Sequence, residues 1–384
     1  MQLLFESLFN GVAIGSVLLM AALGLAIVFG LMGVINLAHG ELIMLGAYTT
    51  YVVQLIFKLP AFEPVYNLYV LVAIPLAFVV SGVVGILLER TVIRRLYGNP
   101  LETLLATWGV SLILQQFVRS VPLATAAGVV LALVVGFSLP LVLPAPLLEG
   151  PRARLVRAGC WATSALAGVL LAGGLASQIS RIARATSRNV DVTAPQWMRG
   201  GLEWADLTLP VPRLVIIVMT VVSVLGVTLF LNRSVWGTRI RAVTQNRSMS
   251  DCLGIPTDTV DVLTFGIGSG LAGIAGVAVS LLGSVGPNVG GSYIVGCFMV
   301  VVLGGVGNLF GAVLASFAIG WLTDLIGAGR LLTLWPAMPS PLAATVKFFA
   351  TTSMAQVMVF ALIVLFLQFR PAGLFPQKGR VVEA

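Results

Sequence analysis

Long apolar stretches follow one another along nearly the whole of this 384-residue chain, and they restrict its fold more than any other feature. An α-helix needs about 20 apolar residues to cross the hydrocarbon core of a bilayer. The stretches that approach this length are residues 8–30, 41–57, 67–89, 101–119, 121–147, 155–177, 212–232, 260–283, 293–303, 311–327 and 345–369. With 58% hydrophobic and 9% charged residues, the chain has too few charges to cover a soluble globule. The sequence predicts one all-α, polytopic transmembrane domain over residues 1–384, with about 10–11 spans.

A polar, basic segment at residues 232–256 interrupts this apolar pattern. Several arginines fall close together there, which is typical of a loop on the cytoplasmic side of a membrane. Residues 238–253 contain neither proline nor glycine, and Gly254 and Pro256 follow as stop signals, so we expect a short helix. Two interpretations remain open for this segment, an ordinary cytoplasmic loop and a docking helix for a soluble partner.

The other basic clusters predict the orientation of the chain. Counting spans places residues 90–95, 152–157, 232–256 and 378–380 on one side, and the rule that positive loops face the cytoplasm makes that side the inner one. The amino terminus is then outside. Four arginines between residues 181 and 199 also fall outside, against the rule.

Two of the apolar stretches are broken by similar glycine-rich segments. Gly33–Leu37 and Gly305–Leu309 both read Gly-Val-x-Asn-Leu, which favours an internal repeat with discontinuous helices. A backbone N–H or C=O without a partner in hydrocarbon costs several kcal/mol, so irregular backbone there must line a cavity or be covered by protein. The polar residues in and beside these breaks are candidates for a polar path: Asn36, His39, Glu41 and Asn308. For His39 a packing role, and for Glu41 a favourable charge at a helix N-terminus, remain alternatives.

A polar stripe lies in the apolar stretch at residues 101–119. Thr107, Ser111 and Gln115 recur every four residues and therefore share one face of a helix. Such a stripe is suited to a path for a small hydrogen-bonding solute, and hydrogen bonds between helices are the alternative.

The sequence lacks the motifs of several kinds of nucleotide-binding, catalytic and metal site. There is no Gly-x-x-x-x-Gly-Lys-Ser/Thr loop for ATP, no Ser-His-Asp grouping around the single histidine, and no metal-ligand spacing. We therefore expect no catalytic residue, metal or cofactor, and an uphill transporter would draw energy from an ion gradient or another chain. The net charge of +8 reflects cytoplasmic loops beside anionic lipid of the bilayer, so no nucleic-acid partner is expected.

Six segments of the chain carry a family resemblance. They are GVINLAHGELIMLGAY at 33–48, NPLETLLATWGVSLILQQ at 99–116, NVDVTAPQWM at 189–198, RIRAVTQNRSMSDCLGIP at 239–256, FGIGSGLAGIAGVAVSLLGSVGPNVG at 265–290 and RPAGLFPQKGR at 370–380. Together they resemble the membrane permeases of the branched-chain amino acid type of ABC importer, and more closely the urea-transporter branch of that family.

The resemblance implies a multi-pass subunit of the bacterial inner membrane. Its implied partners are a second homologous permease subunit, two cytoplasmic ATPase subunits and a periplasmic solute-binding protein. It also implies that the loop at 232–256 couples the permease to the ATPases. The coupling residues expected on this basis are Arg239, Arg241, Gln245, Asn246, Arg247, Asp251, Leu253 and Gly254.

Two features depart from the family pattern. Residues 121–188 form an insertion of two apolar segments between the fourth stretch and the NVDVTAPQWM motif, and an even number of added spans preserves the topology. Gly296 stands where the resemblance leads us to expect an acidic residue.

These observations predict a permease that forms part of the translocation pathway for urea or a short amide by alternating access. A branched-chain amino acid permease is the nearest alternative. A passive urea or amide channel is the alternative from another class, and a membrane-embedded enzyme or scaffold is a third.

Overall fold

The computed structural model describes residues 2–58, 63–120, 189–204, 207–330 and 350–375, together with a few isolated positions between 121 and 188 and at 347. The predicted insertion at 121–188 and two of the expected spans, 121–147 and 155–177, therefore lie outside the described residues.

Helices match the nine remaining apolar stretches. Their bounds are α1 Gln2–Met32, α2 His39–Phe57, α3 Tyr69–Thr91, α4 Pro100–Ser120, α8 Val211–Arg233, α11 Thr257–Leu282, α12 Val289–Gly304, α13 Leu309–Gly327 and α16 Thr352–Phe369. In the described part of the chain, seven of these segments are long and apolar enough to cross a membrane, and α12 and α16 are shorter apolar helices. The prediction of an all-helical, polytopic membrane bundle is confirmed.

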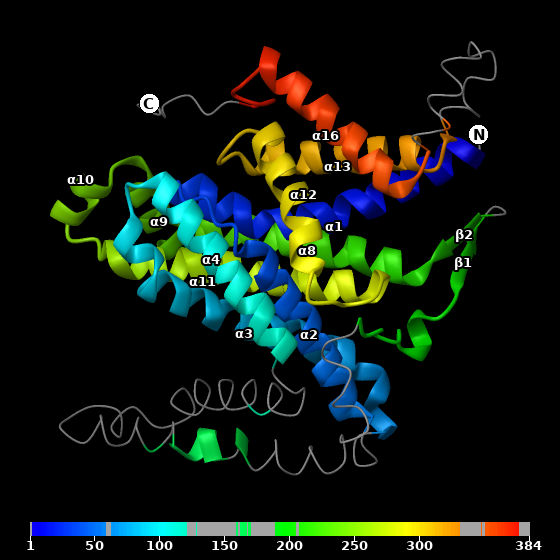
Figure 1. Ribbon diagram of the computed structural model, residues 1–384, viewed down its shortest axis with the longest axis horizontal. Helices are drawn as coiled ribbons and strands as arrows, with labels where there is room; N and C mark the ends of the chain where they lie inside the picture. The colour runs from blue at the N-terminus through cyan, green and yellow to red at the C-terminus, as the bar shows by residue number, and fades with distance from the viewer. Residues whose placement is uncertain are drawn as a thin grey trace.

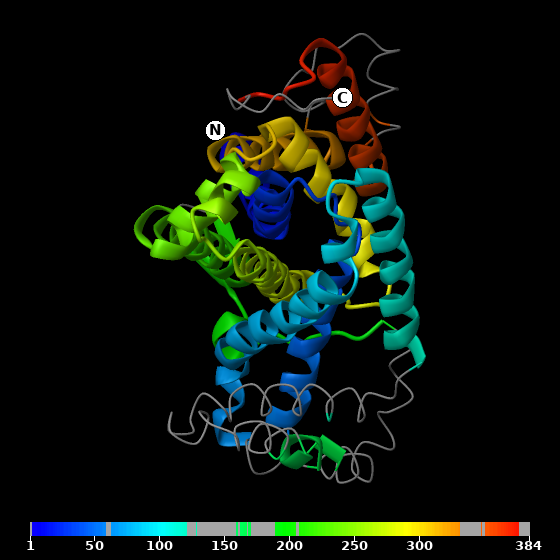
Figure 2. The same ribbon diagram turned by 90° about the vertical axis from the view of Figure 1, so that its left-hand side faces the viewer.

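Helix α11 lies at the centre of the bundle. It packs against α1, α2 and α3, and α1 lies between α11 and α13 (Figure 2). Glycines permit this close packing: a Cβ on Gly24 of α1 would lie 2.1 Å from the carbonyl oxygen of Gly268, and one on Gly46 of α2 would lie 2.2 Å from that of Gly273. Because lipid is as apolar as the side chains, such small-residue contacts supply much of the attraction between membrane helices.

The two ends of the bundle carry different elements. The N-terminal end of α1 lies on one side of Figure 1, and the short helices α9 (Val235–Gln245) and α10 (Arg247–Cys252) lie on the other. Arg94 forms an ion pair with Asp258, so the basic cluster at 90–95 lies at the same end as α10. The backbone N–H of Leu374 donates to the carbonyl of Leu303, near the end of α12. Gly307, which follows α12, approaches Gly30 near the end of α1. The last described residues therefore lie near that end of the bundle as well. Residues 90–95 and 232–256 thus lie at one end of the bundle, and the expectation that this end faces the cytoplasm stays a prediction.

The opposite end carries irregular structure that the sequence analysis did not predict. A hairpin of β1 (Gly201–Trp204) and β2 (Leu207–Pro210) follows the short helix η4 (Gln196–Met198). The segment before η4 crosses the ends of α2 and α3: Gln54 Nε2 and Tyr69 OH both donate to the carbonyl of Thr193, at 3.0 and 2.7 Å. The NVDVTAPQWM motif thus joins the ends of several helices.

The expected single helix over residues 238–253 is wrong. The chain forms α9 and α10 with a break at Asn246, whose backbone is extended and whose side-chain oxygen accepts a hydrogen bond from the N–H of Met249 at 3.0 Å. Asparagine is a strong N-cap because it satisfies an orphan donor of the helix that follows. The stretch at 238–253 therefore breaks at Asn246, although it contains neither proline nor glycine.

Both glycine-rich breaks have the geometry that their glycines permit. Gly33 has φ +69° and Gly305 has φ +99°, in the left-handed region that other L-residues rarely adopt. Each break ends one apolar helix and precedes another. The second break contacts the last turn of α1, since a Cβ on Gly30 would lie 2.5 Å from Cα of Gly307.

Candidate solute pathway

Helix α2 begins part-way along α1 rather than at its end. The ring nitrogen Nε2 of His39, the first residue of α2, lies 2.9 Å from the carbonyl oxygen of Ala21. Ala21 precedes Met32, the last residue of α1, by 11 positions. At the α-helical rise, this separation is about 17 Å. The non-helical residues 33–38 therefore return from the end of α1 to its middle, within the apolar region.

Side chains satisfy part of the broken backbone. Asn36 Oδ1 accepts a hydrogen bond from the N–H of Ala38 at 3.0 Å. Thr107 of α4 reaches across, and its Oγ1 accepts from the N–H of Leu37 at 3.1 Å while donating to the carbonyl of Leu104 at 3.0 Å. An N–H left unpaired at this depth would cost several kcal/mol, so Thr107 supports the break directly.

The polar stripe of α4 faces the first turn of α2. Ser111 Oγ donates to Oε1 of Glu41 at 3.1 Å, and Gln115 Nε2 donates to the same oxygen at 2.7 Å. Glu41 and Ser111 are buried and Gln115 is half-buried. Hydrogen bonds to a carboxylate are stronger than neutral ones, and these two hold the Glu41 side chain against α4.

Three buried polar atoms in this region have no hydrogen-bond partner among the described residues. They are Oε2 of Glu41, Nδ2 of Asn36 and Nδ1 of His39. Glu41 Oε2 is an acceptor and Asn36 Nδ2 is a donor, and Asn36 and Glu41 lie five residues apart around the start of α2. Buried polar atoms are normally paired, so an unpaired acceptor and an unpaired donor around the start of one helix point to a ligand or to water.

The start of α2 crosses the start of α12 at backbone contact. A Cβ on Gly40 would lie 2.4 Å from the carbonyl oxygen of Gly290, and one on Gly290 would lie 2.5 Å from that of Gly40. The first turns of two broken helices therefore meet beside Glu41.

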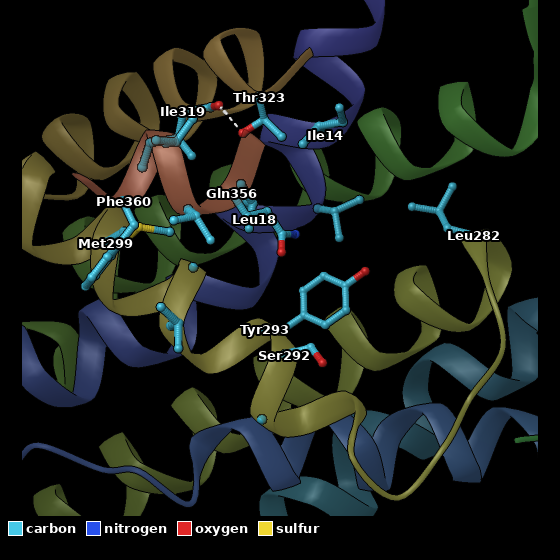
Figure 3. A pocket seen from close by; sticks show the side chains of 16 residues that line it. Ile14, Leu18, Leu282, Ser292, Tyr293, Met299, Ile319, Thr323, Gln356 and Phe360 are labelled. Carbon is cyan, nitrogen blue, oxygen red and sulfur yellow. Dashed lines mark hydrogen bonds between the residues drawn. The ribbon is translucent and has the colours of Figure 1, made fainter. Parts of the chain in front are cut away.

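A cavity of about 630 Å³ is lined by Gly291, Ser292 and Tyr293 in the first turn of α12 and does not include Glu41. Most of its wall is apolar and comes from α1, α12, α13 and α16, including Leu18 and Phe360. Figure 3 shows the Tyr293 hydroxyl pointing into the open space and the Gln356 side chain extending from α16 into the cavity. Gly296, where the resemblance predicts an acidic residue, also lines the wall. An apolar cavity with a few polar groups is the usual form of a small-molecule site.

The structure brings most of the predicted pathway residues together, with one exception. Asn36, Glu41, Thr107, Ser111 and Gln115 surround the start of α2, and His39 lies in the same turn but bonds to α1.

Asn308 lies apart from the other predicted pathway residues. Its Oδ1 accepts from the N–H of Gly311 at 3.1 Å as the N-cap of α13, and its Nδ2 donates to the carbonyl of Phe375 at 3.5 Å. Both of its described bonds therefore serve the local chain. The cavity residues Ser292, Tyr293 and Gln356 were missed, because each is an isolated polar residue in an apolar helix and has no spacing signal.

The expected coupling residues have different surroundings. Arg239 stacks over Trp236, with its guanidinium carbon 4.8 Å from the ring centre, and Arg241 donates to Asn232 Oδ1 at 3.0 Å. Leu253 is 74% exposed, which leaves an apolar side chain at the tip of this segment.

The remaining expected coupling residues divide between the surface and the interior of the segment. Gln245 is exposed, Gly254 turns the chain with φ +78°, and Asp251 Oδ1 accepts from Thr257 Oγ1 at 3.3 Å. Arg247 turns toward α11 and forms ion pairs there.

The family model of branched-chain amino acid transport system permease components matches residues 7–120 and 104–367. The chain belongs to this family. It is therefore a multi-pass transporter subunit and not itself an enzyme that hydrolyses ATP.

Curated relatives match over almost the full length. The chain is 25% identical to the high-affinity branched-chain amino acid transport permease LivH of Salmonella typhimurium, over 96% of this chain and 94% of LivH. It is 25% identical to LivH of Escherichia coli K12 and 26% identical to BraD of Pseudomonas aeruginosa, each over the same shares. No solved structure gives a significant match. These matches support the resemblance at the level of the family and not at the level of its urea branch.

Proposed function

We propose that this permease carries urea or another short amide, as part of an ATP-driven importer. The observation that supports this cargo is the buried group around the start of α2, where Glu41 Oε2 and Asn36 Nδ2 have no described partner. Urea is small and neutral, its N–H groups suit a carboxylate acceptor, and its carbonyl oxygen suits an amide donor. Ser111 and Gln115 orient the carboxylate from α4.

A branched-chain amino acid is the second candidate cargo. The relatives that match the chain are named for that transport. The Glu41 carboxylate would pair with the ammonium group of an amino acid, and the N-terminus of α2 would favour its carboxylate. The two cargoes therefore differ in how strongly they need the negative charge of Glu41.

The proposed mechanism is alternating access in the bacterial inner membrane. Two separate ATPase subunits close on ATP and push on α9 and α10, a second homologous permease completes the pathway, and a periplasmic binding protein delivers the solute. Rigid-body movement of the packed helices then opens the path to one side at a time. The exposed Leu253 and the polar surface of α9 and α10 suit contact with a soluble partner.

Uptake of labelled urea by the complete complex tests the cargo. We expect ATP-dependent uptake that formamide and acetamide inhibit and that leucine does not. Glu41→Gln keeps one acceptor oxygen, so we expect urea uptake to fall by about tenfold, the equivalent of one hydrogen bond. For an amino acid cargo, loss of the countercharge would reduce leucine uptake by about 100-fold or more.

The outcomes of this uptake experiment separate the candidate functions. Inhibition by leucine with no effect of amides would replace urea by an amino acid as cargo. Uptake by the chain alone without nucleotide would replace the importer by a passive channel.

Reversing charge on the outer surface of α9 is expected to abolish uptake. Arg239→Glu with Arg241→Glu would place two negative charges where the ATPases are proposed to dock, and like charges across an interface cost several kcal/mol. Insertion and folding should persist, because neither arginine forms an ion pair with a described residue. Arg239→Lys with Arg241→Lys is the matched control. Normal uptake by the glutamate variant, with the ATPases present, would remove these residues from the docking surface.

A further inference from the structure

Arg247, the first residue of α10, binds the first turns of α11. Its Nη1 lies 2.6 Å from Oδ2 of Asp261, and its Nη2 lies 3.8 Å from Oδ1 of Asp258. Both carboxylates belong to α11, the central helix of the bundle. The guanidinium of a residue predicted from the sequence to meet an ATPase thus pairs with carboxylates of its own chain, while 45% of the Arg247 side chain stays exposed.

A second arginine extends these pairs to α3. Arg94 Nη1 lies 3.2 Å from Oδ2 of Asp258, and its Nε lies 3.4 Å from Oε1 of Glu89 near the end of α3. We call Glu89, Arg94, Arg247, Asp258 and Asp261 the ion-pair clamp. Through it, α10, α11 and α3 are joined at one end of the bundle.

The clamp joins two buried carboxylates to partners at the edge of the bundle, where the side chains of Arg94, Arg247 and Asp258 are 38%, 45% and 64% exposed. The side chains of Glu89 and Asp261 are 0% and 4% exposed. Removing one partner of a buried pair leaves an uncompensated charge, which is strongly destabilising, whereas exposed pairs contribute little. Arg247 therefore supplies the charge that compensates the buried carboxylate of Asp261.

An aromatic residue completes the surroundings of Arg247. The guanidinium carbon lies 4.9 Å from the ring centre of Tyr97, between α3 and α4. Burial raises the pKa of Tyr97, and the carboxylates of Asp261 and Glu89 raise it further, so the ring remains a neutral partner for the cation.

Helix α11 leads from the clamp to the start of α2. A Cβ on Gly276 of α11 would lie 2.2 Å from the carbonyl oxygen of Ile43, two residues after Glu41. A Cβ on Gly268 would lie 2.8 Å from that of Gly24, one turn from the His39 contact on α1. Backbone contacts of this kind leave no slack, so a shift of α11 must move α2 and α1 or break their packing.

We infer that Arg247 is a positioning residue that transmits movement of α10 to α11 and α3, through the ion-pair clamp, and does not itself dock an ATPase. The inference rests on the proposed ATP-driven importer but not on its cargo. The coupling element would then have an outer surface on α9 for the partner and an inner arginine for transmission.

Transport by the complete complex tests the inference, with Arg247→Ala, Asp261→Arg and the swapped pair Arg247→Asp with Asp261→Arg. We expect each single variant to retain its ATPase subunits on purification and to hydrolyse ATP, while uptake falls by about tenfold or more. The swapped pair should recover uptake to within about threefold of the native complex, because it restores the pairing in reverse. Arg95→Ala is the matched control, since Arg95 is exposed beside Arg94, and it should leave uptake unchanged.

Two results would overturn the inference. In one, Arg247→Ala retains native uptake. In the other, Arg247→Ala loses the ATPase subunits and the swapped pair does not regain them, which would make Arg247 a docking residue.

Thermal unfolding of the purified chain separates a failure of the clamp from a failure of the importer. Arg247→Ala should lower Tm and the swapped pair should restore it, whether or not the native complex shows ATP-dependent uptake. An unchanged Tm in Arg247→Ala would contradict the clamp itself. Absence of ATP-dependent uptake in the native complex, with the Tm pattern as expected, would contradict only the proposed function.

Discussion

Replacing Gly290 by leucine is expected to abolish uptake and to destabilise the fold. A Cβ at this position would lie 2.5 Å from the carbonyl oxygen of Gly40 and 2.9 Å from the backbone nitrogen of Glu41. Neither backbone atom is the end of a flexible side chain, so α2 and α12 would have to separate. Overpacking of a close-packed core costs about 1–3 kcal/mol, and a backbone clash belongs at the upper end of that range. The separation would also displace Glu41 from Ser111 and Gln115.

A glycine of an exposed helix face provides the control for Gly290→Leu. Among the described residues, no heavy atom lies within 4 Å of a Cβ added to Gly226 in α8 or Gly109 in α4, apart from their own helix and chain neighbours. Leucine at either position should leave uptake and Tm close to native, or raise Tm slightly because leucine favours a helix more than glycine does. Thermal unfolding in detergent and solute uptake measure both effects. If Gly290→Leu were as stable and active as Gly226→Leu, the crossing of α2 and α12 would not be as close as described.

Replacing Gln115 by leucine is expected to reduce uptake by about 10- to 100-fold, because it removes a donor to a buried carboxylate, a bond of about 1.5–3 kcal/mol. Gln115 Nε2 lies 2.7 Å from Oε1 of Glu41, and only Ser111 would remain as a described partner of that oxygen. The side chain of Glu41 would then be free to turn away from α4. Insertion into the membrane should not suffer, because leucine is the more apolar residue.

The adjacent glutamine of the same helix serves as the control. Gln116 is exposed, so Gln116→Leu makes the same chemical change on the outer face of α4. It should retain native uptake and native assembly with the partner subunits. Native uptake by both variants would remove Gln115 from the pathway. The same loss of uptake in both variants would attribute the effect to the hydropathy of α4 as a whole.

Hydropathy and charge alone determined the fold class and the chain order of the described helices. A span must bury its backbone polar groups in its own hydrogen bonds and present apolar side chains to lipid, so its signal is local in the sequence. The nine apolar stretches in the described part of the chain therefore coincide with helices. The face shared by Thr107, Ser111 and Gln115 was predictable for the same reason, because helical periodicity fixes which residues align.

Only the tertiary structure showed which residues these helix faces contact. The alternatives for the α4 stripe, a solute path or bonds between helices, both involve its contacts with Glu41, and no spacing in the sequence relates residue 41 to residues 111 and 115. The break at Asn246 was not expected either, because a capping side chain competes with helix continuation only where the following turn can form.

Composition and periodicity determined a multi-pass helical membrane protein with a basic segment on one side, since both are local properties of the chain, and the permease family came from resemblance. The tertiary structure decided that Asn308 caps α13, that Gly40 meets Gly290, and that Arg247 faces Asp261. Each of these joins residues through the packing of helices, and which polar groups meet inside a membrane depends on how closely the backbones approach. That approach is set by glycines on two different helices at once, so no single stretch of sequence contains it.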